Sequence, residues 1–303
     1  MRFLLRRGLA ALLLVFAVTS GALLLAQLAP GDFAAQFGRD PAEIAAERHR
    51  LGLDRPVLEQ YTRWLRRTLT LDLGESFQKQ QPVTTLVRQA AGNTAILASA
   101  ALIVATLIGI PWGVMTGTRT GRATRLLRGV SLVLLSVPPL ISALVMLTIA
   151  ARTGWLPVSG MGGLSHLVIP TLALALPIAA LLERLQSQSI GEAMRRASTA
   201  AARARGIPEP RVVWRHGWRQ SLGPILAIYG VIVGSLFSGS FAVEIVTSWP
   251  GLGALMRDAL MARDTYLVAG CAAAGAAFLA AGILAADVAH AIADPRVTLE
   301  DAR

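Results

Sequence analysis

The stretch NTAILASAALIVATLIGIPWGVMTGT, residues 93–118, decides the fold class of this chain. It runs for 26 residues without an aspartate, glutamate, lysine or arginine. A helix needs about 20 apolar residues to cross the roughly 30 Å hydrocarbon core of a bilayer, and a backbone surrounded by lipid must satisfy its own hydrogen bonds. The stretch therefore predicts a membrane-spanning helix.

Five further stretches have the same property, and together they predict an all-α membrane protein with six transmembrane helices. The chain has 303 residues, of which 54% are hydrophobic, more apolar surface than one soluble core of this size requires. An N-terminal signal peptide is the alternative for the first stretch, but its apolar run outlasts the usual core of about 7 to 15 residues, so we expect an uncleaved span. The five stretches are residues 8–31, 129–151, 153–182, 220–243 and 265–286.

The basic residues predict the orientation of these helices. The connection after the second stretch holds four arginines and no acid, and the connection after the fourth holds eight arginines against three glutamates. The connections after the third and fifth stretches are neutral or acidic. Because short cytoplasmic loops carry the excess of basic residues, both termini are predicted to be cytoplasmic.

The same reasoning divides the chain into three segments. Residues 1–31 are the N-terminal span, residues 32–92 an extracytoplasmic loop, and residues 93–303 a core of five spans. Apolar side chains at helical spacing predict an amphipathic helix in the loop, lying on the membrane surface or on the bundle. They are Val57, Leu58, Tyr61, Trp64 and Leu65.

Several classes of function are disfavoured by the sequence. The single lysine, Lys79, follows a glutamine, so the chain has no ATP-binding P-loop. No catalytic motif is present, and neither a metal site nor a cofactor is predicted, because Cys271 is the only cysteine and the four histidines are scattered. The net charge of +11 arises mainly from two short loops beside spans, which indicates anionic membrane lipid and not nucleic acid as the partner.

A basic stretch rich in small residues, ASTAAARARGIPEP at residues 197–210, interrupts the apolar pattern. Its alanines favour a helix, and Gly206 and Pro208 end it, which predicts a short helix near residues 197–208. The surrounding segment, residues 192–226, resembles the cytoplasmic signature of the permease subunits of ABC importers. That signature reads Glu-Ala-Ala, three residues, Gly, and its four named positions are occupied here by Ala200, Ala201, Ala202 and Gly206.

The resemblance is to the dipeptide, oligopeptide and nickel branch, in which the signature glutamate is also replaced. Other landmarks of that branch occur in order along nearly the whole chain. They are PGD at residues 30–32, LGLDRPVLEQY at 51–61, LDLGESF at 71–77, SVPPL at 136–140, WLPVSG at 155–160, VEIVTSWPGLG at 243–253, RDTY at 263–266 and DPR at 294–296.

This resemblance implies a type I ABC importer permease fold in the bacterial inner membrane, with a cytoplasmic coupling helix between the fourth and fifth spans. It implies four kinds of partner: a second homologous permease, two ATP-binding cassette ATPase subunits that hydrolyse the ATP, an extracytoplasmic substrate-binding protein and membrane lipid. The residues expected to couple to the ATPase are Ala200, Ala201, Ala202, Arg203, Arg205 and Gly206.

The substrate and the outer surface are less determined by the sequence. The resemblance implies di- or oligopeptides as substrate, with nickel or a metal chelate as the alternative. Glu244 and Trp249 are expected to form an outer gate or a contact for the binding protein, or to have packing roles. A membrane-embedded enzyme and a membrane scaffold are the alternatives from other classes.

Overall fold

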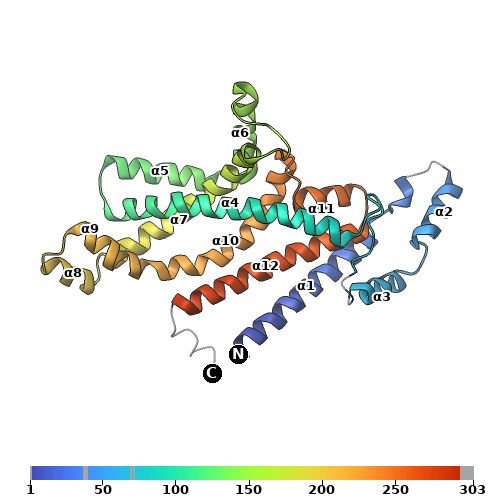
Figure 1. The fold of residues 1–303 in the computed structure, drawn as a ribbon, viewed down its shortest axis with the longest axis horizontal. Helices are drawn as coiled ribbons and strands as arrows, with labels where there is room; N and C mark the ends of the chain where they lie inside the picture. The colour runs from blue at the N-terminus through green and yellow to red at the C-terminus, as the bar shows by residue number, and fades with distance from the viewer. Residues whose placement is uncertain (1, 37–39, 69, 71, 294–303) are drawn as a thin grey trace. The chain divides into compact units, whose positions relative to one another are not determined.

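The computed structural model describes residues 2–36, 40–68, 70 and 72–293. Within these residues the secondary structure is helical and contains no β-strand beyond one isolated bridge between Glu75 and Pro82. Figure 1 shows the order of the helices along the chain. Their contacts group them into two compact units, residues 1–95 with 248–281, and residues 96–247 with 282–303. The landmark DPR lies outside the described residues.

The first unit contains the N-terminal helix, the predicted loop and most of the last helix. Its elements are α1 (Arg2–Leu28), η1 (Ala34–Gln36), α2 (Pro41–Leu51), α3 (Val57–Thr68), the start of α4 (Val83–Thr118), α11 (Leu252–Met261) and most of α12 (Thr265–Ala293). Residues 248–281, which follow α10 in the chain, thus group by contacts with the N-terminal segment.

The amphipathic helix predicted in the loop is α3, and its apolar face packs on the helices of its unit. Trp64 is buried in a cluster with Leu23 of α1 and Ala269 of α12. The Tyr61 hydroxyl lies 3.1 Å from Ser20 Oγ of α1. Of the two alternatives, membrane surface or bundle, these contacts favour the bundle.

Two of the landmark stretches meet in this unit. Asp264, from RDTY, is fully buried and caps α12 by accepting from the Leu267 N–H at 3.1 Å. Its other oxygen accepts from Ser76 Oγ at 2.6 Å and from the Gln78 N–H at 3.2 Å. A buried carboxylate that is hydrogen-bonded in this way fixes the LDLGESF segment to the start of α12.

The second unit carries the basic connections. It contains the remainder of α4, α5 (Arg122–Ser136), α6 (Pro139–Thr153), α7 (Leu164–Ala193), α8 (Ala197–Ala204), α9 (Glu209–Val212), the π-helical turn η2 (Val213–Gly217) and α10 (Trp218–Thr247). Figure 1 shows α8 and α9 between the end of α7 and the start of α10.

The number of spans agrees with the prediction only if one of them is broken. Within the described residues, five helical segments are long and apolar enough to cross a membrane: Arg6–Leu28, Val83–Thr118, Leu164–Ala193, Glu209–Thr247 and Thr265–Ala285. The predicted third span, residues 129–151, is not one straight helix but the pair α5 and α6, bent by 102°. Pro138 and Pro139 explain the break, since proline lacks an N–H donor and forces the preceding residue out of the helical region. Val137 accordingly has φ −90° and ψ 118°.

The sequence-based prediction placed the fourth span, residues 153–182, too early in the chain, because the corresponding helix is α7 at Leu164–Ala193. Residues 154–163 are not helical, although the sequence predicted a span there. α7 starts only at Leu164, because Gly154 and Gly160 adopt left-handed φ values of 68° and 86°. At the other end α7 continues eleven residues past Leu182 to Ala193. Glu183, assigned from sequence to the following loop, therefore lies inside a membrane helix.

Three glycines let α4 approach α7 closely. A Cβ at Gly109 would lie 2.5 Å from the Ala179 carbonyl oxygen, one at Gly113 2.7 Å from that of Glu183, and one at Gly117 2.5 Å from that of Ser187. These distances are shorter than van der Waals contact, so no larger residue fits. Small residues spaced four apart lie on one face of a helix and allow a neighbouring helix to approach closely. Here that neighbouring helix is α7.

Candidate coupling site

The short helix predicted from the alanine-rich stretch is α8, Ala197–Ala204. Alanine has the highest intrinsic helix propensity, and five of the eight residues are alanine. The hydroxyl of Thr199 joins α8 to the end of α7. Its Oγ1 lies 2.7 Å from the Arg196 carbonyl oxygen, 3.0 Å from that of Ala193 and 3.2 Å from that of Met194, so its single proton is shared among carbonyl groups at the end of α7 and in the turn that follows.

Gly206 ends the helix, as its place in the sequence predicts. Its φ is +76°, a left-handed conformation that strains residues with a side chain. The Gly206 N–H donates to the Arg203 carbonyl at 2.9 Å, and the Ile207 N–H donates to the Ala202 carbonyl at 3.3 Å. This reversal returns the chain toward the bundle, where Ile207 packs on the cluster beneath α8.

α8 has a packed face and an open face. Ala202 is 0% exposed and lies in an apolar cluster with residues of α4, α7, α9 and η2. Ala200, Ala201 and Arg205 are exposed, as is Gly206. The cluster consists of Val114, Ile190, Met194, Ala202, Val212 and Val213.

Arg203 connects three parts of the site. Its guanidinium donates to both carboxylate oxygens of Glu209 in α9, at 2.9 and 2.7 Å, and to the Met194 carbonyl at 3.0 Å. The hydrogen bond to Glu209 raises the pKa of Arg203 above its ordinary value. Because both side chains of the pair remain about half exposed, the ion pair contributes at most about 1 kcal/mol. Its main effect is on geometry, since it holds α8 and α9 on either side of the Gly206 turn.

The start of α10 is interlocked with the end of α7. Gln186 Nε2 donates to Ser221 Oγ at 2.9 Å, and Ser189 Oγ donates to the Ser221 carbonyl at 3.0 Å. At the π-helical turn, a Cβ on Gly217 would lie 2.7 Å from Met194 Sδ, so glycine permits this contact. Single π-turns inserted in α-helices occur often at functional sites.

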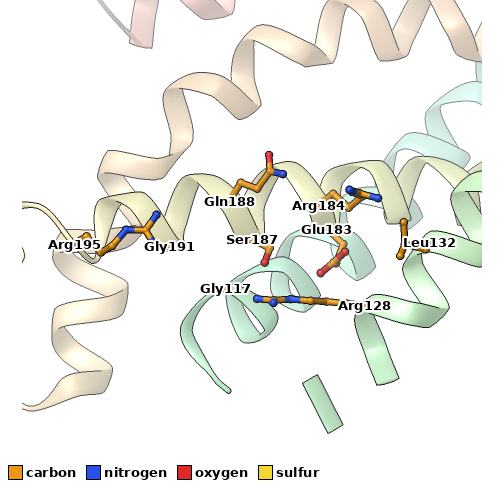
Figure 2. Close-up of a pocket in the computed structure, with 9 residues that line it drawn as sticks. All are labelled: Gly117, Arg128, Leu132, Glu183, Arg184, Ser187, Gln188, Gly191 and Arg195. Atoms are coloured by element: carbon orange, nitrogen blue, oxygen red, sulfur yellow. The ribbon is translucent and has the colours of Figure 1, made fainter. Parts of the chain in front are cut away.

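Glu183 is a polar residue of this region that sequence reasoning did not select. It is 1% exposed, and its two carboxylate oxygens accept from the hydroxyl of Thr116 in α4 and, at 2.6 Å, from that of Ser131 in α5. Figure 2 shows Glu183 and Ser187 directed from α7 toward Arg128 and Gly117. The available signal was its place at the end of an apolar run, where ionisable residues are functional candidates.

Glu244 and Trp249, expected at the outer surface, are both buried. Trp249 is 2% exposed, and its indole N–H donates to the Asn93 carbonyl at 3.1 Å. Asn93 Nδ2 in turn donates to the Pro250 carbonyl at 2.8 Å. Glu244 is 0% exposed in α10. These positions favour the packing alternative for Trp249 in the isolated chain.

Within the part of the chain that the structure describes, no three histidine, cysteine, aspartate or glutamate residues are grouped so that they could hold a metal ion. What the site offers is a small open helix face attached firmly to the ends of α7 and α10.

Comparisons with known proteins identify the family of this chain. Residues 109–299 match the family described as "Binding-protein-dependent transport system inner membrane component", and residues 1–98 match its N-terminal region. The oligopeptide transport system permease protein AppB of Bacillus subtilis is 30% identical over 97% of this chain and 98% of its own length. The dipeptide transport system permease protein DppB of Lactococcus lactis is 30% identical over 98% and 99%. A putative peptide permease protein of Brucella ovis is 32% identical over 98% and 99%.

Proposed function

The chain belongs to the family of binding-protein-dependent transport system inner membrane components, and as the permease subunit of an ABC importer we propose that it carries di- or oligopeptides across the inner membrane. The names of the relatives support this substrate class. The multi-pass helices support a location in the membrane.

The open face of α8 is the proposed contact for an ATPase subunit. The observation that carries this proposal is the contrast between neighbouring alanines, because Ala201 is exposed whereas Ala202 is buried against four other elements. Exposed small residues allow another protein surface to approach the helix backbone closely. Ala202 and Arg203 then attach α8 to the permease, while Ala200, Ala201, Arg205 and Gly206 face the partner.

In the proposed mechanism α8 transmits movement of the ATPase to the spans. The Thr199 and Arg203 contacts tie α8 to the end of α7, and the Ser221 contacts tie α7 to α10. A displacement of α8 therefore shifts α7 and α10 together. The chain works with a second permease, two ATPase subunits that hydrolyse ATP, and an extracytoplasmic binding protein. Both termini are cytoplasmic in this arrangement.

Replacing an exposed alanine by a bulky residue tests the ATPase contact. Ala201→Trp should prevent co-purification of the ATPase subunits encoded beside this gene and abolish uptake of a labelled dipeptide. The matched control is Ala123→Trp, which changes an exposed alanine in the first turn of α5. Retention of the ATPase by Ala201→Trp, with unchanged uptake, would remove α8 as the contact.

The substrate class needs a separate measurement. Cells that lack this gene and its neighbours should lose uptake of labelled di- or oligopeptides, and the genes should restore it. If the deletion abolished nickel uptake and left peptide uptake unchanged, the metal alternative would replace the peptide assignment.

A further inference from the structure

A pocket of about 390 Å³ opens beside the buried Glu183, between the end of α4, the middle of α5 and the last part of α7 with the turn after it. Gly117 and Gly191 contribute no side chain to it, which leaves room beside the backbone. Figure 2 shows Arg128 entering from α5 on one side of α7, with Arg184 and Gln188 on the other side and Arg195 toward the end of the helix. The remaining lining residues are Leu132, Glu183 and Ser187.

The lining has a surplus of positive charge. Three arginines line the pocket and Glu183 is the only acid among the lining residues. The Glu183 carboxylate is already hydrogen-bonded to two hydroxyl groups. Arg128 donates to the Thr116 carbonyl at 2.6 Å, which holds its guanidinium at the pocket. The side chains of Arg184 and Arg195 make no hydrogen bond or ion pair with the described residues, so their guanidinium donors are available.

The position of the pocket along α7 matches the depth expected for lipid headgroups. α7 begins at Leu164, and at 1.5 Å per residue Arg184 lies about 30 Å along the helix, the thickness of the hydrocarbon core. The end of α4 at Thr118 adjoins the same pocket. Arginines that line a cleft between helix ends at this level are placed to meet the phosphate groups of lipids.

An apolar surface continues from the pocket along α5. Leu132 lines the pocket and is itself exposed, and Leu126 and Val133 on the same helix are 70% and 63% exposed. Exposed aliphatic side chains next to a cationic pocket match the two parts of a phospholipid, an acyl chain and an anionic headgroup.

We propose that the pocket formed by Arg128, Arg184 and Arg195 binds the headgroup of an anionic phospholipid, with an acyl chain along α5. Guanidinium groups pair with phosphate oxygens through charge-assisted hydrogen bonds, and Ser187 and Gln188 supply neutral donors. The site is independent of the peptide assignment, because it rests on charge, depth and apolar surface alone.

The test compares lipid retention by three forms of the purified full-length permease. Native mass spectrometry measures the affinity for phosphatidylglycerol relative to phosphatidylcholine with the same acyl chains. Arg184→Gln combined with Arg195→Gln should lower this preference about five-fold for each arginine removed. Neither side chain bonds to the described protein, so the variant should fold. Arg122→Gln combined with Arg125→Gln, which removes the same charge from exposed positions outside the pocket, is the control and should keep most of the preference.

Three outcomes would overturn the proposal. An equal loss in the control variant would mean that the lipid is attracted by the general charge of the loops. Binding of inorganic phosphate at the same arginines as tightly as phosphatidylglycerol would assign the pocket to a soluble anion. Unchanged lipid retention by Arg184→Gln with Arg195→Gln, together with loss of ATPase co-purification, would assign it to the ATPase interface.

Discussion

Replacing Ala202 and Ala201 separately by leucine tests whether α8 has the two faces that the structure gives it. The residues are adjacent, chemically identical and in the same helix, so local propensity cancels in the comparison. Ala202 is 0% exposed among Val114, Ile190 and Met194, whereas Ala201 is exposed. Extra methyl groups in a packed cluster cost about 1 to 3 kcal/mol, while a change at an exposed position remains within about 0.5 kcal/mol.

This difference in free energy converts into a difference in the population of the locally opened state. Because 1.4 kcal/mol corresponds to a factor of ten, Ala202→Leu should increase the open population of the α8 segment about 5- to 140-fold. Limited digestion with trypsin, which cleaves after Arg205 at the end of α8, measures that population when opening is fast relative to cleavage. Ala201→Leu should be cleaved at close to the original rate.

The two variants should also lose the ATPase for different reasons. Ala201→Leu should keep α8 in place and weaken ATPase co-purification, whereas Ala202→Leu should release α8 from its cluster first. Equal cleavage rates for the two variants, or faster cleavage of Ala201→Leu, would refute the assignment of faces.

Three further predictions concern single features of the fold. Gly206→Val should destabilise the α8 turn by roughly 1 to 2 kcal/mol, because Gly206 has a φ of +76° that a β-branched residue adopts only with strain. No atom lies within 4 Å of the added Cβ, so the cost comes from the backbone and not from a clash. Gly206→Asn should be tolerated, and trypsin cleavage compares the two variants. Glu183→Leu should lower the Tm of the purified permease more than Glu183→Gln, because glutamine keeps one acceptor for Thr116 or Ser131; equal Tm values would show that the carboxylate holds nothing together. In a Cys271→Ser background, an impermeant thiol reagent should label Glu43→Cys from outside and not Arg211→Cys, and the reverse pattern would invert the proposed topology.

The sequence was informative where one residue type has one structural consequence. The uncharged stretches predicted the spans, and the alanine run closed by Gly206 predicted α8 within a few residues. It was uninformative about which alanine of the run faces the bundle, because residues of equal size and polarity carry no periodic signal. Ala202 is distinguished by the side chains of α4, α7, α9 and η2 that surround it.

The predictions for Glu183 and for the third span were wrong for different reasons. An acid next to an apolar run reads as the start of a loop unless its partners are known, and Thr116 and Ser131 are 67 and 52 residues away in the chain. The stretch at residues 129–151 is uncharged and was predicted as one helix, although it contains the adjacent Pro138 and Pro139. Two consecutive prolines remove two donors and restrict the residues before them, which produces a bend of 102° and not a mild kink.

The contacts of α8 with α7 indicate how movement at the proposed ATPase contact would reach the membrane spans. Coupling between distant sites needs a contiguous element that moves as a body. Thr199 and Arg203 hold α8 to the end of α7, and Gln186 and Ser189 hold α7 to α10. Between these contacts lies the π-helical turn Val213–Gly217, which interrupts the regular α-helical hydrogen bonding of the segment from Glu209 to Thr247. We expect motion of α8 in the proposed importer to bend the chain at this turn, because the contacts on both sides of it are tied to α7.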